Sequence, residues 1–306
     1  MNSDGDTTLN ENEQMISDAA QARNQSLIRA QPKINRFLLD GQSGSFNASV
    51  TQGLGNFDFT TSSDRPVWIA GQGQWSTQGD METSYANVAV GAHFEPRENT
   101  LLGVMAQFDN AVTDEGVARL ESTGWLVGPY AVARLSEQPL VFSGSYLVGQ
   151  SDNTISPLGT YEDEYASDRS IATLGVAGEL ELTRLTLIPL LDLAYVTDEN
   201  EAYTDGASNP VGAVKVTTTQ TTLGLDFVMP IATANGSLDL IGGVGATSSR
   251  TDNGVEETDS TRGQTELGFR YGLENGGRLT ARATYDGLAD DEYEAFGAEV
   301  IFEISF

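Results

Sequence analysis

From Pro66 to the C-terminus, the sequence is a succession of segments in which apolar and polar residues alternate. Successive side chains of a β-strand point to opposite faces, so each segment has one apolar and one polar face. The alternation predicts twelve strands, near residues 66–77, 83–94, 99–109, 119–134, 139–150, 169–183, 184–197, 214–229, 236–249, 262–273, 277–286 and 292–306. A strand of a soluble β-sandwich shows the same alternation, so the pattern of a single segment does not decide between the two folds.

The lengths of the strands and connections distinguish these folds. Strands of about 10–16 residues exceed the usual soluble length of about 5–6. Short turns alternate with mostly longer polar links, which include 110–118, 151–168, 198–213 and 250–261. This asymmetry is typical of outer-membrane barrels, and an even strand number places both ends of the sheet on the short-turn side. The prediction is an all-β fold: a 12-stranded antiparallel transmembrane β-barrel over residues 66–306.

Composition is compatible with this fold. The hydrophobic content of 39% and the mean hydropathy of -0.25 resemble those of a soluble protein, but alternating strands dilute the hydropathy signal. No run of 18 apolar residues is present, so no membrane-spanning helix is expected. The absence of cysteine excludes disulfides and thiolate chemistry, and the net charge of -28 argues against nucleic acid and anionic lipid surfaces as partners. The acidic start lacks a secretory signal, which indicates a cytoplasmic protein or a fragment of a longer precursor.

The first 65 residues differ from the strand region. Residues 1–14 predict a disordered polar tail, and residues 15–40 predict an α-helix that Pro32 kinks or splits. About 25 helical residues span roughly 38 Å, which is enough to cross a bilayer. Residues 41–65 predict a linker or a short hairpin. The helix carries a basic face, which cannot face lipid and consists of Arg23, Arg29, Lys33 and Arg36.

The polar faces of the predicted strands carry carboxylates that are suited to pairing with this basic helix. Half of the 44 carboxylates lie in or beside the longer links, and many others point to the inner face of the predicted barrel. Opposite charges attract more strongly where the local dielectric is low. We therefore expect the helix to lie inside the pore, paired with an acidic lumen formed by Glu179, Asp192, Asp226, Glu266, Glu299 and Glu303.

This order of elements is similar to the translocator domain of type V autotransporters. The local resemblances are RPVWIAGQGQWS at 65–76, SYANVAVGAHFE at 84–95, TLLGVMAQFD at 100–109, TGWLVGPYAVARL at 123–135 and FGAEVIFEISF at 296–306. The resemblance covers about residues 15–306. It implies a bacterial outer-membrane barrel with a helix through its pore and a passenger on the N-terminal side, of which residues 1–14 are the remnant. It also implies a C-terminal signal for the barrel-assembly machinery at Gly297, Val300, Phe302 and Phe306, with a departure at Ala295, where a polar residue is usual.

Other candidate sites are weaker. His93 is the only histidine, and no GxSxG motif accompanies it, so a wet side chain at the barrel rim is expected rather than a catalytic base. Some autotransporters cut their own helix by asparagine cyclisation or with acidic lumen residues, but Asn10, Asn12 and Asn24 lack the Asn-Asn pair of the best-known cleaving class. The carboxylates of 286–292 lack the spacing of a calcium loop. Interfacial aromatic residues are expected at Trp68, Trp75, Trp125, Phe302 and Phe306.

The sequence therefore predicts a monomeric translocator domain that anchors and exports an N-terminal passenger through a helix-plugged barrel. It predicts no enzymatic activity, no cofactor and no metal. Expected partners are outer-membrane lipid and lipopolysaccharide, the barrel-assembly machinery and the protein's own passenger. Two alternatives stay open, which are an outer-membrane diffusion porin with an open lumen and a soluble acidic β-rich adhesin.

Overall fold

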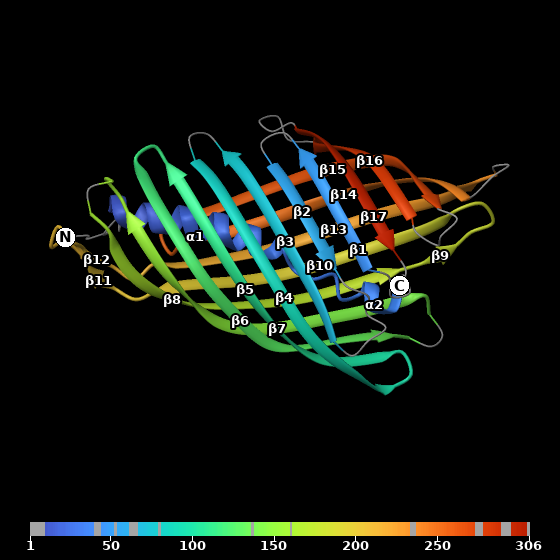
Figure 1. The fold of residues 1–306 in the computed structure, drawn as a ribbon, viewed down its shortest axis with the longest axis horizontal. Coiled ribbons are helices and arrows are strands. Elements are labelled where there is room, and N and C mark those ends of the chain that lie inside the picture. Colours follow the sequence, from blue (N-terminus) through green and yellow to red (C-terminus); the bar gives the residue numbers. More distant parts are fainter. Residues whose placement is uncertain are drawn as a thin grey trace, which may run out of the picture.

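The long strands form one antiparallel wall around a central helix (Figure 1). The computed structural model describes residues 10–39, 44–51, 54–60, 67–78, 81–135, 138–159, 161–232, 237–272, 278–288 and 295–304. The helices are α1 (Glu11–Arg29) and α2 (Arg36–Leu39). The strands are β1 (Gly44–Thr51), β2 (Leu54–Thr60), β3 (Val67–Gln78), β4 (Met81–Arg97), β5 (Thr100–Glu115), β6 (Ala118–Arg134), β7 (Leu140–Ser156), β8 (Asp163–Gly178), β9 (Leu180–Glu181), β10 (Thr186–Asn200), β11 (Tyr203–Thr204), β12 (Pro210–Val211), β13 (Lys215–Ile231), β14 (Ser237–Asp252), β15 (Glu257–Gly272), β16 (Arg278–Leu288) and β17 (Ala295–Ile304).

The strand pairings return to their starting point. Consecutive long strands pair antiparallel from β1 through β8, and β8 then pairs with β10 and β10 with β13. The ladder continues through β14 to β17, and β17 pairs with β1. Each long strand in the described residues therefore has two hydrogen-bonded neighbours, as a membrane-spanning sheet requires.

The number of strands differs from the expected twelve. Residues 44–51 and 54–60, predicted as part of a linker or short hairpin, form β1 and β2 and lie in the wall between β17 and β3. Together with the twelve anticipated strands they make fourteen long strands among the described residues. The Gly-, Ser- and Asn-rich sequence of this hairpin obscured its strand character, because these residue types also dominate loops.

The predicted longer links are mostly strand as well. Residues 110–115 extend β5, residues 151–156 extend β7, and residues 257–261 belong to β15. The connection from β10 to β13 is different, because its residues 201–214 contain the small hairpin of β11 and β12. The asymmetry between the two ends of the barrel is therefore carried by strand length as well as by loop length.

Side chains alternate between the two faces of the wall as the sequence predicts. On β4, Tyr85, Asn87 and Ala89 are buried, and Val88 between them is 45% exposed. The outward phase forms an apolar band, which includes Val67, Ile69, Val88, Val104, Phe108, Val127, Phe142, Val148, Leu174, Leu193, Leu223, Leu225, Val244, Leu267, Phe269 and Val300. Apolar side chains that face outward from a sheet without an open edge suit a lipid environment.

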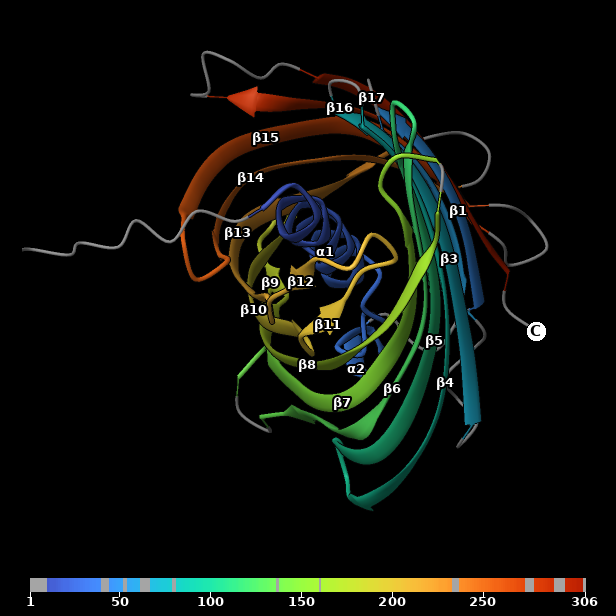
Figure 2. The ribbon, with the colours of Figure 1, turned by 90° about the vertical axis from the view of Figure 1, so that its left-hand side faces the viewer.

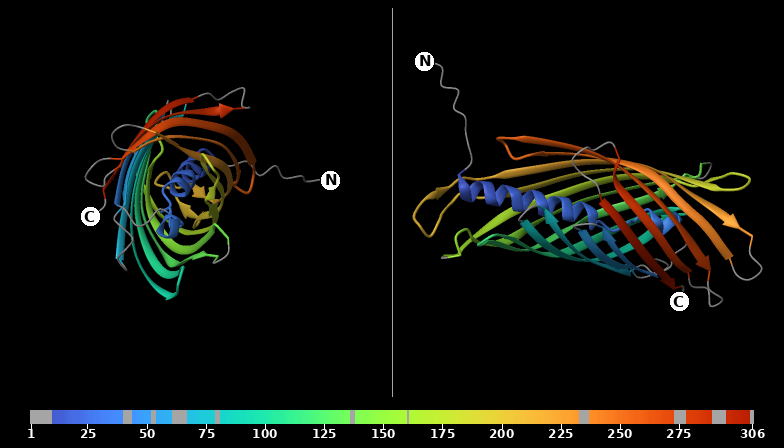
Figure 3. Two further views of the ribbon diagram at one scale, coloured as in Figure 1. Left: turned by 90° about the vertical axis from the view of Figure 1, so that its right-hand side faces the viewer. Right: turned by 90° about the horizontal axis from the view of Figure 1, so that it is seen from above.

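Helix α1 lies inside the ring of strands (Figure 2, Figure 3). Asn10 caps it in a capping box with Glu13, which satisfies two backbone N–H groups at its start. The helical conformation is interrupted between Arg29 and Arg36, in the stretch that contains Pro32. Side chains along α1 are buried against the wall, namely Ile16, Ser17, Ala19, Ala20, Arg23, Asn24, Ser26 and Leu27.

The two ends of the barrel hold different elements. The N-terminus of α1 lies at the end that also contains β11 and β12, which we refer to as the hairpin end (Figure 1). Helix α2 lies at the opposite end, the α2 end (Figure 1). No helix in the described part of the chain is long and apolar enough to span a membrane.

Candidate functional site

The candidate site is the interior of the barrel where α1 contacts the strands. Near the middle of α1, the guanidinium of Arg23 forms a salt bridge with Asp198 of β10. It also donates to Asn153 Oδ1 at 2.7 Å and to Ser151 Oγ at 3.1 Å, both on β7. All four side chains are buried. The basic helix is thus joined to two strands by one charged side chain.

A second ion pair in the wall adjoins this contact. Arg169 of β8 donates two hydrogen bonds to Asp109 of β5, at 2.8 and 2.9 Å. Its Nε lies 3.8 Å from Asp198 Oδ2, so Asp198 is placed between two guanidinium groups. Charges that are removed from water are tolerated when each has a well-oriented partner. The four residues therefore form one electrically neutral cluster, which we refer to as the lumen ion cluster (Arg23, Asp109, Arg169 and Asp198).

At the hairpin end, the β10–β13 connection contacts the first turns of α1. Gly212 N donates to Glu13 Oε1 at 2.7 Å, and Asn12 Nδ2 donates to Asp205 Oδ2 at 3.2 Å. Ile16 and Ala19 of the helix belong to one buried apolar cluster, whose wall and connection members are Leu120, Ile155, Val211, Val214 and Val216. This connection therefore contacts the helix through both polar and apolar groups.

The same connection is attached to β8. Tyr203 stacks on Tyr165 with ring centroids 5.5 Å apart and planes 7° apart. Gly206 N donates to Asp163 Oδ1 at 2.9 Å. The backbone N–H of Asn209 donates to Asp205 and is the main reason that the pKa of this carboxyl lies below its usual range. The hairpin is thus held between the helix and the wall.

At the α2 end, aromatic residues surround Phe37. Its ring centroid lies 5.5 Å from those of both Trp68 and His93, and 6.4 Å from that of Tyr130. Trp68 Nε1 donates to the Tyr130 hydroxyl at 2.8 Å, which also lies 2.8 Å from His93 Nδ1. Arg134 donates to the carbonyl of Leu38. Helix α2 is therefore fixed to β3, β4 and β6.

Two glycines make room for this aromatic cluster. A Cβ atom on Gly91 would lie 2.4 Å from the Trp68 ring, and one on Gly103 would lie 2.4 Å from the Tyr130 ring. Aromatic side chains that cover glycines on a neighbouring strand are a recurrent device in β-sheets. The positions of the Trp68 and Tyr130 rings are therefore determined by glycines of the wall as well as by contact with Phe37 of α2.

Comparison with known proteins gives the family of this chain. The family model of the autotransporter β-domain matches residues 67–291. The chain belongs to this family. This autotransporter β-domain is a secretion domain and is located in the bacterial outer membrane, where it serves as a translocator; a passenger is implied by the family.

Solved structures of autotransporters have the same fold. The β-domain of the Bordetella autotransporter BrkA aligns with a TM-score of 0.56 and 16% identity, covering 87% of this chain and 100% of that one. The translocator domain of NalP from Neisseria meningitidis aligns with a TM-score of 0.55 and 18% identity, covering 95% and 98%. A sequence search finds no match among curated proteins. The predicted family resemblance and all-β outer-membrane fold are confirmed, whereas the count of twelve strands is not.

The four predicted basic residues of the autotransporter helix occupy different environments. Arg23 is buried in the lumen ion cluster, and Arg29, Lys33 and Arg36 are exposed. Arg29 donates to Gln25 Oε1 of its own helix at 3.4 Å. Electrostatic attraction links Lys33 to Asp192 and Asp226, and Arg36 to Asp226. The predicted basic face is therefore divided between one side chain buried in an ion pair and three exposed side chains.

The predicted acidic lumen residues are also divided. Asp192 and Asp226 lie on the inward phase of β10 and β13. Glu266 pairs with Arg282 of the neighbouring strand β16, at 2.7 and 2.8 Å, and thus stabilises the wall itself. Glu179 lies half-buried beside β9. The side chains of Glu299 and Glu303 lie outside the described residues.

Sequence reasoning missed three members of the lumen ion cluster. Asp198 falls in the predicted link 198–213, because the strand predicted at 184–197 ends one residue too early. Asp109 and Arg169 stand at the ends of the predicted strands 99–109 and 169–183, and the alternation alone gives them no role. Asp198 has the same phase as Asp192 and the buried Val196, so extending the alternation of β10 by a few residues would have placed it inside.

Two aromatic predictions are wrong. Trp68 is 1% exposed and faces the lumen, so it is not an interfacial residue, whereas Trp75 and Trp125 are about half exposed. His93 is not a wet side chain at the rim, because it contacts Phe37 and Tyr130. Both errors arise because alternation gives the phase of a residue only when the phase of the whole strand is known.

The other candidate residues are placed as follows. Asn10 caps α1, Asn12 bonds Asp205, and Asn24 is buried with its amide 3.5 Å from the carbonyl of Val216. In the C-terminal signal, Gly297, Val300 and Phe302 lie in β17, and Val300 is half exposed. Phe306 and most of 286–292 lie outside the described residues. Among the described residues, no group of three metal-ligating side chains is found.

Proposed function

We propose that α1 stays in the barrel after export as a plug that anchors an N-terminal passenger at the hairpin end. The observation that carries this proposal is the buried Arg23–Asp198 salt bridge, supported by the contacts of the hairpin with Glu13 and of the wall with Phe37. These contacts hold α1 near its start and near its middle, and they hold α2, which follows it. The lumen therefore contains protein where a diffusion porin would contain water.

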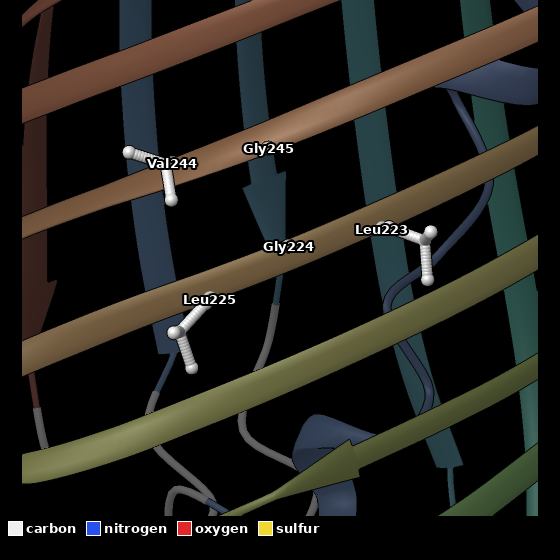
Figure 4. A pocket seen from close by; sticks show the side chains of 5 residues that line it. All are labelled: Leu223, Gly224, Leu225, Val244 and Gly245. Atoms are coloured by element: carbon white, nitrogen blue, oxygen red, sulfur yellow. The ribbon is translucent and has the colours of Figure 1, made fainter.

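The outer surface supports anchoring in lipid. In addition to the apolar band, an open apolar hollow of about 300 Å³ lies on β13 and β14, lined by Leu223, Gly224, Leu225, Val244 and Gly245 (Figure 4). Contact of this apolar surface with lipid chains is more favourable than contact with water, because removal of apolar area from water lowers the free energy. We propose outer-membrane lipid and lipopolysaccharide as its surroundings. This surface argues against the soluble adhesin.

We further propose that the domain carries out no chemistry on a small substrate. His93, the candidate base from the sequence, is engaged with Tyr130 and packed on Phe37. For assembly, we propose recognition of β17 by the barrel-assembly machinery through Gly297, Val300, Phe302 and Phe306. The support for this is the position of β17 between β16 and β1, where the ladder is joined.

Single-channel conductance tests the plug. The intact domain and a variant without residues 1–40 are reconstituted in planar bilayers. We expect low, infrequent conductance from the intact domain and a large steady conductance from the deletion variant, because removal of α1 and α2 opens the lumen. Heat-modifiable gel mobility shows that both barrels are folded. Equal conductance of two folded barrels would contradict the plug and favour the porin.

A further inference from the structure

The contact partners of Arg23 form a preorganised receptor for one guanidinium group. Asn153 Nδ2 donates to Ser167 Oγ at 3.0 Å and to the carbonyl of Tyr165 at 3.2 Å. These bonds occupy the amide nitrogen, so Asn153 Oδ1 is the atom presented to Arg23. The orientation of the receptor thus follows from contacts within the wall.

The net charge of the wall residues in this receptor is neutralised by a single cation. Asp109 is neutralised by its two bonds to Arg169, both within the wall. Asp198 is 3% exposed and lies 3.8 Å from the shared Arg169. Without the helix, these three residues would carry one net negative charge inside the barrel. A buried charge that lacks a partner is strongly unfavourable.

Helix α1 supplies that cation at only one position along the barrel axis, which we refer to as its height. Arg23 and Arg29 are the basic residues of α1. Arg29 is six positions away, which at 100° per residue points it in a different direction from Arg23. A shift of the helix by one turn would bring Ala19 or Leu27 to Asp198, because residues four apart lie on one face. Either shift leaves Asp198 unpaired.

We infer that Arg23 is the positioning residue that sets how far the chain is exported, since the helix stops where Arg23 meets Asp198. This inference rests on the proposed retention of α1 in the barrel. The competing cause is the short connection from α2 to β1 together with the packing of Phe37, which would fix the helix from the α2 end. The two causes predict different behaviour when the cation is moved along the helix.

The decisive variant exchanges Ala19 and Arg23 as Ala19→Arg with Arg23→Ala. The exchange preserves composition, net charge and the helix face, and moves the cation one turn towards the N-terminus. The chain has no cysteine, so single cysteines at positions 8 to 18 serve as reporters of depth. They are labelled on intact cells with a membrane-impermeant maleimide. In the protein without the exchange (the parent), Gln14 is exposed and Ile16 and Ser17 are buried. The labelling yield is therefore expected to drop between positions 14 and 16, which we refer to as the labelling boundary.

The exchange variant should show this boundary moved by about four residues towards the N-terminus, a shift of about 6 Å. Arg23→Lys keeps a cation at the original height and should leave the boundary in place. A folded exchange variant with an unmoved boundary would overturn the inference and assign the register to the α2 end. Labelling at every position of the parent would instead contradict retention of α1.

Asp198→Asn gives a second test that does not alter the helix. It removes the charge that Arg23 satisfies, so the helix should lose its fixed height and the boundary should broaden over several positions. Heat-modifiable mobility again identifies the folded fraction. A boundary as sharp as that of the parent in the folded Asp198→Asn barrel would overturn the role of this ion pair in setting the register.

Discussion

At the scale of single residues, buried charge is the main determinant of the interior. Asp109 and Arg169 are 2% and 0% exposed in their side chains and are joined by two hydrogen bonds. Such a pair stabilises less than its geometry suggests, because both groups are removed from water. Removal of only one partner is strongly destabilising, however, because the charge of the other partner stays buried.

The burial of both charges determines the expected effect of single and paired substitutions. Asp109→Leu alone should lower the free energy of unfolding by about 3–5 kcal/mol, because Arg169 is left without its main partner. Asp109→Leu combined with Arg169→Met should recover most of this loss, since no unpaired charge remains. The measurement is the denaturant midpoint of the heat-modifiable band. Equal destabilisation of the single and double variants would contradict a charge-based explanation.

At the scale of elements, the β11–β12 hairpin depends on Asp205, which accepts hydrogen bonds from Asn209 and Asn12. The pKa of Asp205 is lowered in the folded protein, so its contribution is present above the ordinary aspartate pKa of about 3.9 and is lost as the pH falls through the lower, folded value.

We therefore expect residues 201–214 to resist limited proteolysis from pH 7 down to about pH 4 and to become susceptible below it. An acid-stable protease with broad specificity provides the measurement. Asp205→Asn removes the titrating group and should abolish the acid transition. The same transition in Asp205→Asn would show that another carboxyl is responsible.

The elements also show how much the sequence can predict. Alternation predicted the strand at 83–94, in which Asn87 and Ala89 lie on the opposite face from Val88, because the period of two is a property of the strand itself. It did not give the ends of strands, so Asp198 was assigned to the rim. It left Gly44–Thr51 open as part of a linker or a short hairpin, since the place of β1 beside β17 depends on long-range pairing. The helix was predictable from Arg23 and its apolar neighbours, but its partner in the wall was not.

At the scale of the whole molecule, a wall of strands that is apolar outside surrounds a helix. The reciprocal amide pair of Gln31 and Gln107 lies at the contact between the two parts, with hydrogen bonds of 3.1 and 3.0 Å. Gln107 is 0% exposed, whereas the next residue, Phe108, points outward and is 56% exposed. Adjacent positions on β5 therefore distinguish the inside of the barrel from the outside.

The most direct test is cross-linking in intact cells with a short thiol-specific reagent. The variant Gln31→Cys with Gln107→Cys should give a cross-linked species of altered gel mobility in high yield, because both side chains meet in the lumen. The matched variant Gln31→Cys with Phe108→Cys should give none. Absence of the first cross-link, or equal yields from both variants in folded barrels, would contradict the position of the helix segment inside the wall.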